Sequence, residues 1–165
     1  MSFDEWVADL RDLIRRVGED SFDSPDDDWM AMCFAMTIDG NPLMVPLPME
    51  MFAPEMKQVL YMALTALLRE FKADRAAMLS STWYVEAPPG TTDPEAFRAS
   101  LPPCLGDYPG RKEMLVVVAA DIAHEEMWTA PITRGGPTPE LGEWELVKGA
   151  DGNLIAAMRE AVSAA

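Results

Sequence analysis

The sequence predicts an α+β fold in which helices flank a mainly antiparallel, five-stranded sheet. Two observations predict it. Apolar residues recur with helical spacing near both ends and in the middle of the chain, and between these stretches they form short runs bounded by turn residues, as strands do. The expected order is α-β-β-α-β-β-β-α, and its hairpins indicate antiparallel neighbours. The 165 residues fit one domain, 1–165.

A helix is expected at the start of the chain. Ser2 and Glu5 have the spacing of a capping box, and apolar residues then recur on one face as far as Val17. Gly18 follows where a C-terminal cap belongs. The acidic stretch 19–28 is a polar loop, and it lacks the ligand spacing of a calcium-binding EF-hand.

The first strand is expected over 29–38, where large and small side chains alternate. Both of its faces are largely apolar, which indicates a central strand. Its small-residue face, which includes Cys33, is expected to be covered by a helix or by another subunit. Asp39-Gly40 is a hairpin signal. The return strand over 43–47 carries Pro46 and is flanked by Pro42 and Pro48, and because proline cannot donate to a ladder, an edge strand or an irregular one is expected.

The second half of the chain continues the pattern. Pro54 opens a second helix that is expected to run to about Lys72, because proline is favoured in a first turn. Asp151 is a candidate cap for the last helix. Between these two helices the sequence predicts strands over 76–86, 112–121 and 126–134, and a further short strand within 141–148.

A long proline-rich insert, 87–111, separates two of these strands. A short helix from Asp93 to about Arg98 is expected inside it. Loops of this length are uncommon in compact domains, and they are often functional. The insert is therefore one place where a binding site is expected.

The chain is strongly acidic, with 28 acidic and 13 basic residues and a net charge of −15. This balance disfavours binding to nucleic-acid phosphates or to anionic membrane surfaces, and it fits a basic protein partner. The N-terminus has neither the basic nor the apolar region of a signal peptide, and two cysteines make no disulfide framework. A cytoplasmic location is the expectation.

No catalytic or cofactor constellation is visible in the sequence. His124 is the single histidine, whereas zinc sites and Ser-His-Asp triads need further partners, and no Gly-x-Ser-x-Gly elbow occurs. We interpret His124 as an exposed turn residue. The stretch 106–113 resembles a Walker A loop only superficially, because Glu113 stands where a hydroxyl residue is needed. We expect no cofactor, and a non-catalytic role is favoured over an enzymatic one.

Aromatic and sulfur side chains supply the remaining candidates. Thirteen methionines occur, eight of them between Met30 and Met62, and their spacing favours core filling, with an adaptable methionine-lined binding surface as the second interpretation. A pocket under the insert would lie near an aromatic and cationic cluster. The full set of candidate ligand or interface residues is Trp83, Tyr84, Cys104, Tyr108, Arg111, Trp128 and Trp144.

Three later segments, 80–86, 111–119 and 128–134, resemble parts of small uncharacterised bacterial and phage proteins of no assigned activity. This resemblance covers roughly the C-terminal half, and it implies a shared fold without any site residues. The order of elements is also similar to that of roadblock and profilin-like α/β/α sandwiches, a likeness that carries no motif.

Three functions follow as hypotheses. The first is a non-catalytic interaction or accessory protein with an acidic surface, as a homodimer or with a basic protein partner. The second is a small-molecule binder or enzyme with its site under the insert. The third is an acidic inhibitor that mimics the charge of nucleic acid.

Overall fold

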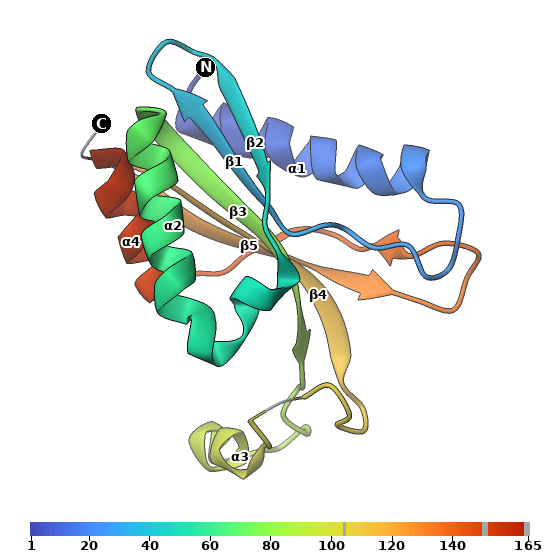
Figure 1. Ribbon diagram of the computed structural model, residues 1–165. Coiled ribbons are helices and arrows are strands. Elements are labelled where there is room, and N and C mark those ends of the chain that lie inside the picture. The colour runs from blue at the N-terminus through green and yellow to red at the C-terminus, as the bar shows by residue number, and fades with distance from the viewer. Residues whose placement is uncertain (104, 150–151, 164–165) are drawn as a thin grey trace.

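The computed structural model describes residues 1–103, 105–149 and 152–163, and its centre is one seven-stranded sheet with helices on both faces (Figure 1). Along the chain the elements are α1 Phe3–Ser21, β1 Met32–Thr37, β2 Pro42–Pro46, the short 3-10 helices η1 Met49–Phe52 and η2 Pro54–Met56, α2 Lys57–Glu70, β3 Ala73–Tyr84, α3 Pro94–Ser100, β4 Lys112–Asp121, β5 Glu125–Thr133, β6 Glu140–Leu141, β7 Glu145–Leu146 and α4 Asn153–Ser163.

The sheet order is β2-β1-β3-β4-β5-β6, with β7 also paired to β5. Every pairing among the described strands is antiparallel. The antiparallel α+β architecture is therefore confirmed. The expected five strands and their order are wrong in detail. Two strands of two residues each, β6 and β7, occur where one short strand was expected, and the expected order left out both this region and the short helix of the insert.

Helix α1 begins at the expected capping box but ends later than expected. Ser2 Oγ accepts a hydrogen bond from Glu5 N at 3.2 Å, and Glu5 Oε2 accepts one from Ser2 N at 2.7 Å. The prediction that Gly18 ends the helix is wrong, since α1 continues to Ser21. Gly18 is instead a contact point for the Trp29 indole, because a Cβ there would lie 2.5 Å from the ring. The indole Nε1 donates to Ile14 O at 2.9 Å.

Strand β1 separates two apolar layers. Its small-residue face, Ala31, Cys33 and Ala35, packs in a core that includes α2 and α4. The sequence left open whether a helix or another subunit covers this face. Helices of the same chain cover it. Phe34 points to the opposite face, where it packs in the core beneath α1. The strand itself is shorter than expected, because Trp29 turns towards α1 before the ladder begins at Met32.

The connection between α2 and β3 is tighter than the sequence indicated. The helix ends at Glu70 rather than at Lys72, and the residues from Ala73 to Arg75 already belong to β3. Lys72 makes this possible with a φ of 50°, the left-handed conformation that reverses the chain within two residues.

Strands β3 and β4 pair along ten positions, so that their hairpin extends past the body of the molecule and carries the insert with α3 at its end (Figure 1). The short helix expected there is present, and Asp93 caps it by accepting a hydrogen bond from Ala96 N at 3.0 Å. The expected cap Asp151 lies outside the described residues. Among the helices of the described ranges, none is long and apolar enough to span a bilayer.

Candidate functional site

A cleft of about 810 Å³ lies where the β3–β4 hairpin meets β5. The strand register builds it, because Tyr84 pairs with Lys112, Trp83 pairs with Glu113, and Glu113 pairs in turn with Ile132. The cleft is therefore lined from three neighbouring strands and from the end of the insert. Of the predicted candidates, the cleft brings together Trp83, Tyr84 and Arg111.

The Arg111 side chain is held against an indole. Its Cζ lies 4.7 Å from the centroid of the Trp83 ring, and its Nη1 donates to Tyr108 O at 3.4 Å. Such a cation–π contact contributes about 0.5–1 kcal/mol where it is exposed. Tyr108 thus takes part through its backbone carbonyl. Cys104, the remaining candidate of the insert, lies outside the described residues.

The other cations of the cleft are already paired with carboxylates. Arg134 holds Glu113 through two hydrogen bonds, Nε to Oε2 at 2.7 Å and Nη2 to Oε1 at 3.0 Å, and it also approaches Asp28 at 3.1 Å. Lys112 Nζ lies 2.8 Å from Glu86 Oε2. Arg111 is the lining cation for which the described residues show no carboxylate partner.

Burial and neighbouring charges both shift the pKa values of Arg134 and of its partner Asp28. The hydrogen bonds to Glu113 are the main cause that raises the pKa of Arg134. Burial raises the pKa of Asp28, against the opposing effect of Arg134. By strand alternation Glu113 lies on the same face of β4 as the buried Leu115 and Val117, and it is only 8% exposed. A carboxylate at such a position is the sequence signal for an ion pair that the sequence analysis missed.

Trp128 and Trp144 are not part of the cleft. Both pack against the core beneath α1. The Arg11 Cζ atom lies 3.6 Å from the centroid of Trp128, and Trp128 Nε1 donates to Glu126 Oε2 at 2.7 Å. Burial lowers the pKa of Arg11, and Glu126 opposes this effect. These two tryptophans therefore help to fasten α1 to the sheet and present no common binding surface with Trp83.

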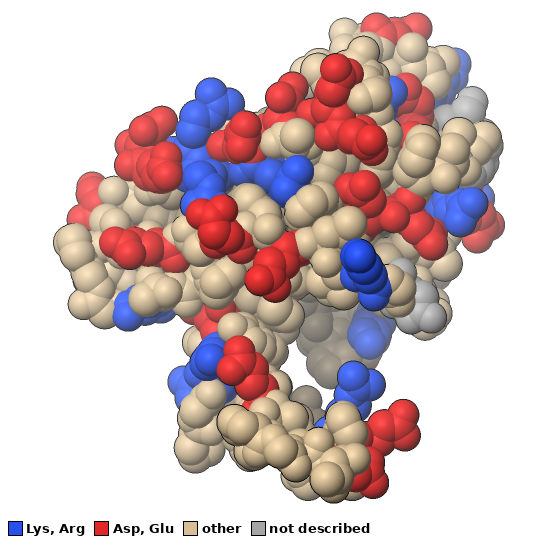
Figure 2. All heavy atoms as spheres, turned by 180° about the vertical axis from the view of Figure 1, so that it is seen from behind, with Lys and Arg blue, Asp and Glu red and all other residues tan. Residues whose placement is uncertain are grey.

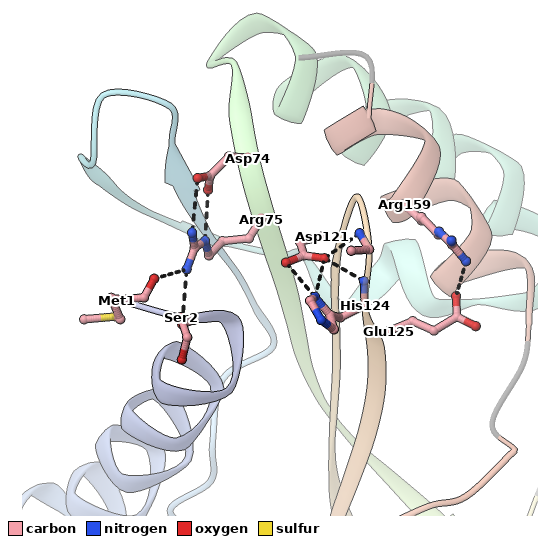
Figure 3. A network of polar contacts seen from close by, with 9 residues as sticks. Met1, Ser2, Asp74, Arg75, Asp121, His124, Glu125 and Arg159 are labelled. Carbon is pink, nitrogen blue, oxygen red and sulfur yellow. Dashed lines mark hydrogen bonds and ion pairs between the residues drawn. The ribbon is translucent and has the colours of Figure 1, made fainter.

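His124 lies in the turn between β4 and β5, where its side chain is 57% exposed, as expected (Figure 3). Its Nδ1 lies 3.0 Å from Asp121 Oδ1, and its ring stacks on Phe3 with centroids 5.2 Å apart. Burial raises the pKa of Asp121, but hydrogen bonds from Ala123 N and His124 outweigh it, so that the pKa is lowered.

The neighbouring contacts in Figure 3 tie the start of α1 to the sheet. Arg75 Nη1 donates to Met1 O at 3.1 Å and to Ser2 O at 3.3 Å, while Arg75 Nε lies 3.0 Å from Asp74 Oδ1. Within the described part of the chain, no hydroxyl or thiol hydrogen-bonds the His124 ring. Among these residues, the pair of His124 and Asp121 has no third member of a triad, and its contacts join the β4–β5 turn to Phe3 of α1.

The possible ligands of a metal ion and the described thiol are distributed as follows. In the ranges that the structure describes, no three His, Cys, Asp or Glu side chains converge so that they could hold a metal ion. Cys33 is 1% exposed, and burial raises the pKa of its thiol to about 11. A thiol with such a pKa is inert at neutral pH.

A second concave surface, which we call the methionine groove, runs between α1 and the edge formed by β1 and β2. Two hollows of about 400 and about 150 Å³ make it up, and both are lined by Leu13, Phe34 and Met44. The side chain of Met44 is 58% exposed and that of Met30 is 63% exposed. Core filling, the first interpretation of the sequence, is wrong for these methionines, since none of the eight from Met30 to Met62 is buried.

The groove exists because α1 covers only part of its face of the sheet. The core beneath α1 takes residues from β1, β3, β4 and β5 and none from β2. Met44 pairs with Phe34 and so points to this open side. Asp9 and Arg16 of α1 line the groove, and by helical spacing Asp12 and Asp20 continue the same side of the helix.

Acidic side chains are spread over the molecule. On the face shown in Figure 2 they are interspersed with basic side chains, and no continuous acidic row is visible on that face. No protein-family model, curated protein or solved structure that was compared with the chain matches it.

Proposed function

We propose that the chain is a non-catalytic protein-interaction domain that binds a positively charged partner through the methionine groove. The observation that carries this proposal is a contiguous apolar surface with exposed methionines beside α1. Large exposed apolar patches on soluble proteins usually mark interaction sites. Methionine suits such a surface, because its flexible side chain adapts to different apolar partners.

The charge of the chain favours a basic partner over a second copy of itself. The net charge of −15 attracts a cationic protein over long distances and repels another copy of the same chain. The apolar lining would then supply affinity. Full burial of a methionine side chain contributes roughly 1.5–3 kcal/mol. Because Met30 and Met44 are both more than half exposed, each has at least half of its surface left to bury.

The test compares two methionines of similar exposure on opposite faces of the sheet. Met44 lies in the groove, whereas Met62, 71% exposed, lies on α2. A cationic amphipathic peptide of lysine and leucine serves as the probe, and its affinity is measured by isothermal titration calorimetry. We expect Met44→Glu to weaken binding about tenfold or more, which corresponds to a loss of about 1.4 kcal/mol, and Met62→Glu to leave it unchanged.

Two results would count against the proposal. Equal loss of affinity in both variants would mean that the groove is not the binding surface, since an added glutamate by itself attracts a cationic peptide. An acidic peptide with the same leucine pattern that binds as tightly as the lysine peptide would remove the electrostatic part of the argument.

A second candidate function is the binding of a small aromatic anion in the cleft. The observation that favours it is Arg111, which is held on the Trp83 ring without a carboxylate partner among the described residues. Titration with benzoate should then shift the indole N–H resonance of Trp83, and Arg111→Ala should abolish this shift. A resonance that stays unmoved up to millimolar benzoate would refute this candidate.

A further inference from the structure

We infer that the methionine groove receives an amphipathic helix of the partner, which lies beside α1 as the second helix of that layer and does not join the sheet as a strand. The inference rests on the proposed function, since it specifies what occupies the same groove. Two independent features of the fold support it: the unequal covering of the two sheet faces and the backbone of the β2 edge.

The two faces of the sheet carry different numbers of helices in the described part of the chain. Helices α2 and α4 pack side by side on one face, whereas α1 lies alone on the other (Figure 1). The open part of the α1 face is the methionine groove. A helix laid there would pack against α1 on one side and against Met44 on the other, in the arrangement that α2 and α4 already adopt.

The hydrogen-bond pattern of β2 shows which of its backbone groups face outwards. Leu47 N donates to Ala31 O at 2.9 Å, and in the same ladder Thr37 N donates to Asn41 O at 2.9 Å. Hydrogen-bonded and non-hydrogen-bonded pairs alternate in an antiparallel ladder. The odd-numbered residues of β2 are therefore turned towards β1, and the even-numbered residues turn their backbone outwards.

The outward positions of β2 are Pro42, Met44 and Pro46. Proline has no N–H group, so Met44 is the one residue of this strand that can donate to an added strand. Prolines at such positions are a known protection of edge strands against pairing. The partner must therefore use side chains in the groove, and strand addition at β2 is disfavoured.

The dimensions of the groove suit about three turns of helix. Its α1 wall extends from Trp6 to Val17, which is about 16 Å at the helical rise of 1.5 Å per residue. The two hollows would each take one apolar anchor, and anchors one turn apart have the spacing i, i+4. Asp9 and Arg16 are the charged residues of α1 that line the hollows, so the preference for basic residues beside the anchors rests on the net charge of −15.

The experiment uses the full chain and three peptides of about fourteen residues, a length at which an isolated helix is marginal in water. The first is a lysine-rich peptide with leucine at i, i+4 and i+7, stapled on its outer face to hold the helix. The second keeps its composition except for two central prolines that break the helix. The third replaces every lysine of the first by glutamate.

We expect the stapled lysine peptide to bind at least about tenfold more tightly than the other two, and its bound Cα chemical shifts to be helical. Binding should weaken by a similar factor in Met44→Glu and in Met30→Glu, and not in the control Met62→Glu. Met30 lies outside the ladder, so its variant remains informative if Met44→Glu disturbs β2.

The outcomes separate the inference from the proposed function. Equal binding of the proline peptide, or extended shifts in the bound lysine peptide, would overturn the helical occupant and leave the groove as a docking surface. If the lysine peptide binds both groove variants as tightly as it binds the wild type, or if the glutamate peptide binds as tightly as the lysine peptide, the proposed function is overturned as well. If the groove becomes occupied when the protein concentration alone is raised, without any peptide, its occupant is a second copy of the chain. That result would overturn the inference.

Discussion

The contact between Gly18 and Trp29 predicts that Gly18→Ala destabilises the protein, although the same substitution inside a helix normally stabilises it. Gly18 lies inside α1, where replacing glycine by alanine normally stabilises a helix by about 1 kcal/mol. At this position, however, the new Cβ would lie 2.5 Å from the Trp29 Cζ2 atom and 3.1 Å from Cε2. Overpacking of this kind costs about 1–3 kcal/mol.

Displacement of the ring adds to this cost. The indole Nε1 hydrogen bond to Ile14 O is buried, and leaving such a donor unsatisfied costs about 1–3 kcal/mol. We therefore expect Gly18→Ala to lower the free energy of unfolding by about 1–5 kcal/mol in the wild-type background, because the clash and the lost hydrogen bond exceed the helical gain.

A double-mutant cycle isolates the cause. In a Trp29→Leu background the ring is gone, and the same Gly18→Ala substitution should raise the free energy of unfolding by up to about 1 kcal/mol. Urea denaturation followed by far-ultraviolet circular dichroism measures all four proteins. A stabilising Gly18→Ala in the wild-type background would refute the packing of Trp29 on Gly18.

Three further predictions concern stability and reactivity. Arg134→Ala should lower the free energy of unfolding, measured with denaturant, by about 3 kcal/mol because it leaves the buried Glu113 carboxylate unpaired. Adding Glu113→Gln should recover part of this loss, and a loss below about 1 kcal/mol in Arg134→Ala would contradict the ion pair. The lowered pKa of Asp121 stabilises the fold above its ordinary value of 3.8, and this contribution is lost as the pH falls through the lower folded pKa. Asp121→Asn should therefore flatten the decline of stability as the pH falls below the ordinary value of 3.8, and an unchanged profile would contradict the assignment. In a Cys104→Ser variant, iodoacetamide at pH 8 should label Cys33 only as fast as the protein opens, because the thiol is buried and has a pKa of about 11. Rapid labelling of the native protein would contradict that burial.

Local patterns predicted the elements of this fold well. The capping box at Ser2, the alternation along β1 and the proline-rich edge strand each depend on neighbours in the sequence, and each is present. The misplaced ends have tertiary causes. Gly18 resembled a helix cap because nothing local reveals the Trp29 ring that packs on it. The two-residue strands β6 and β7 exist only through their pairing with β5.

The candidate sites were harder to predict for the same reason. The cleft residues Trp83, Tyr84 and Arg111 could be named because they flank one insert, and the strand register then brought them together. Alternation placed Met30 and Phe34 on one face of a strand. It could not show that α1 buries Phe34 and leaves Met30 exposed, since this depends on where a helix crosses the sheet.

The central claim is that the methionine groove, and no other surface, receives a cationic amphipathic segment. Methionine-methyl NMR of the protein, titrated with the stapled lysine peptide at low and high salt, tests it most directly. We expect the methyl resonances of Met30 and Met44 to shift while that of Met62 stays in place, with affinity that falls as salt screens the charges. Shifts confined to Met62, or groove methyls that stay unmoved at saturating peptide, would contradict the claim.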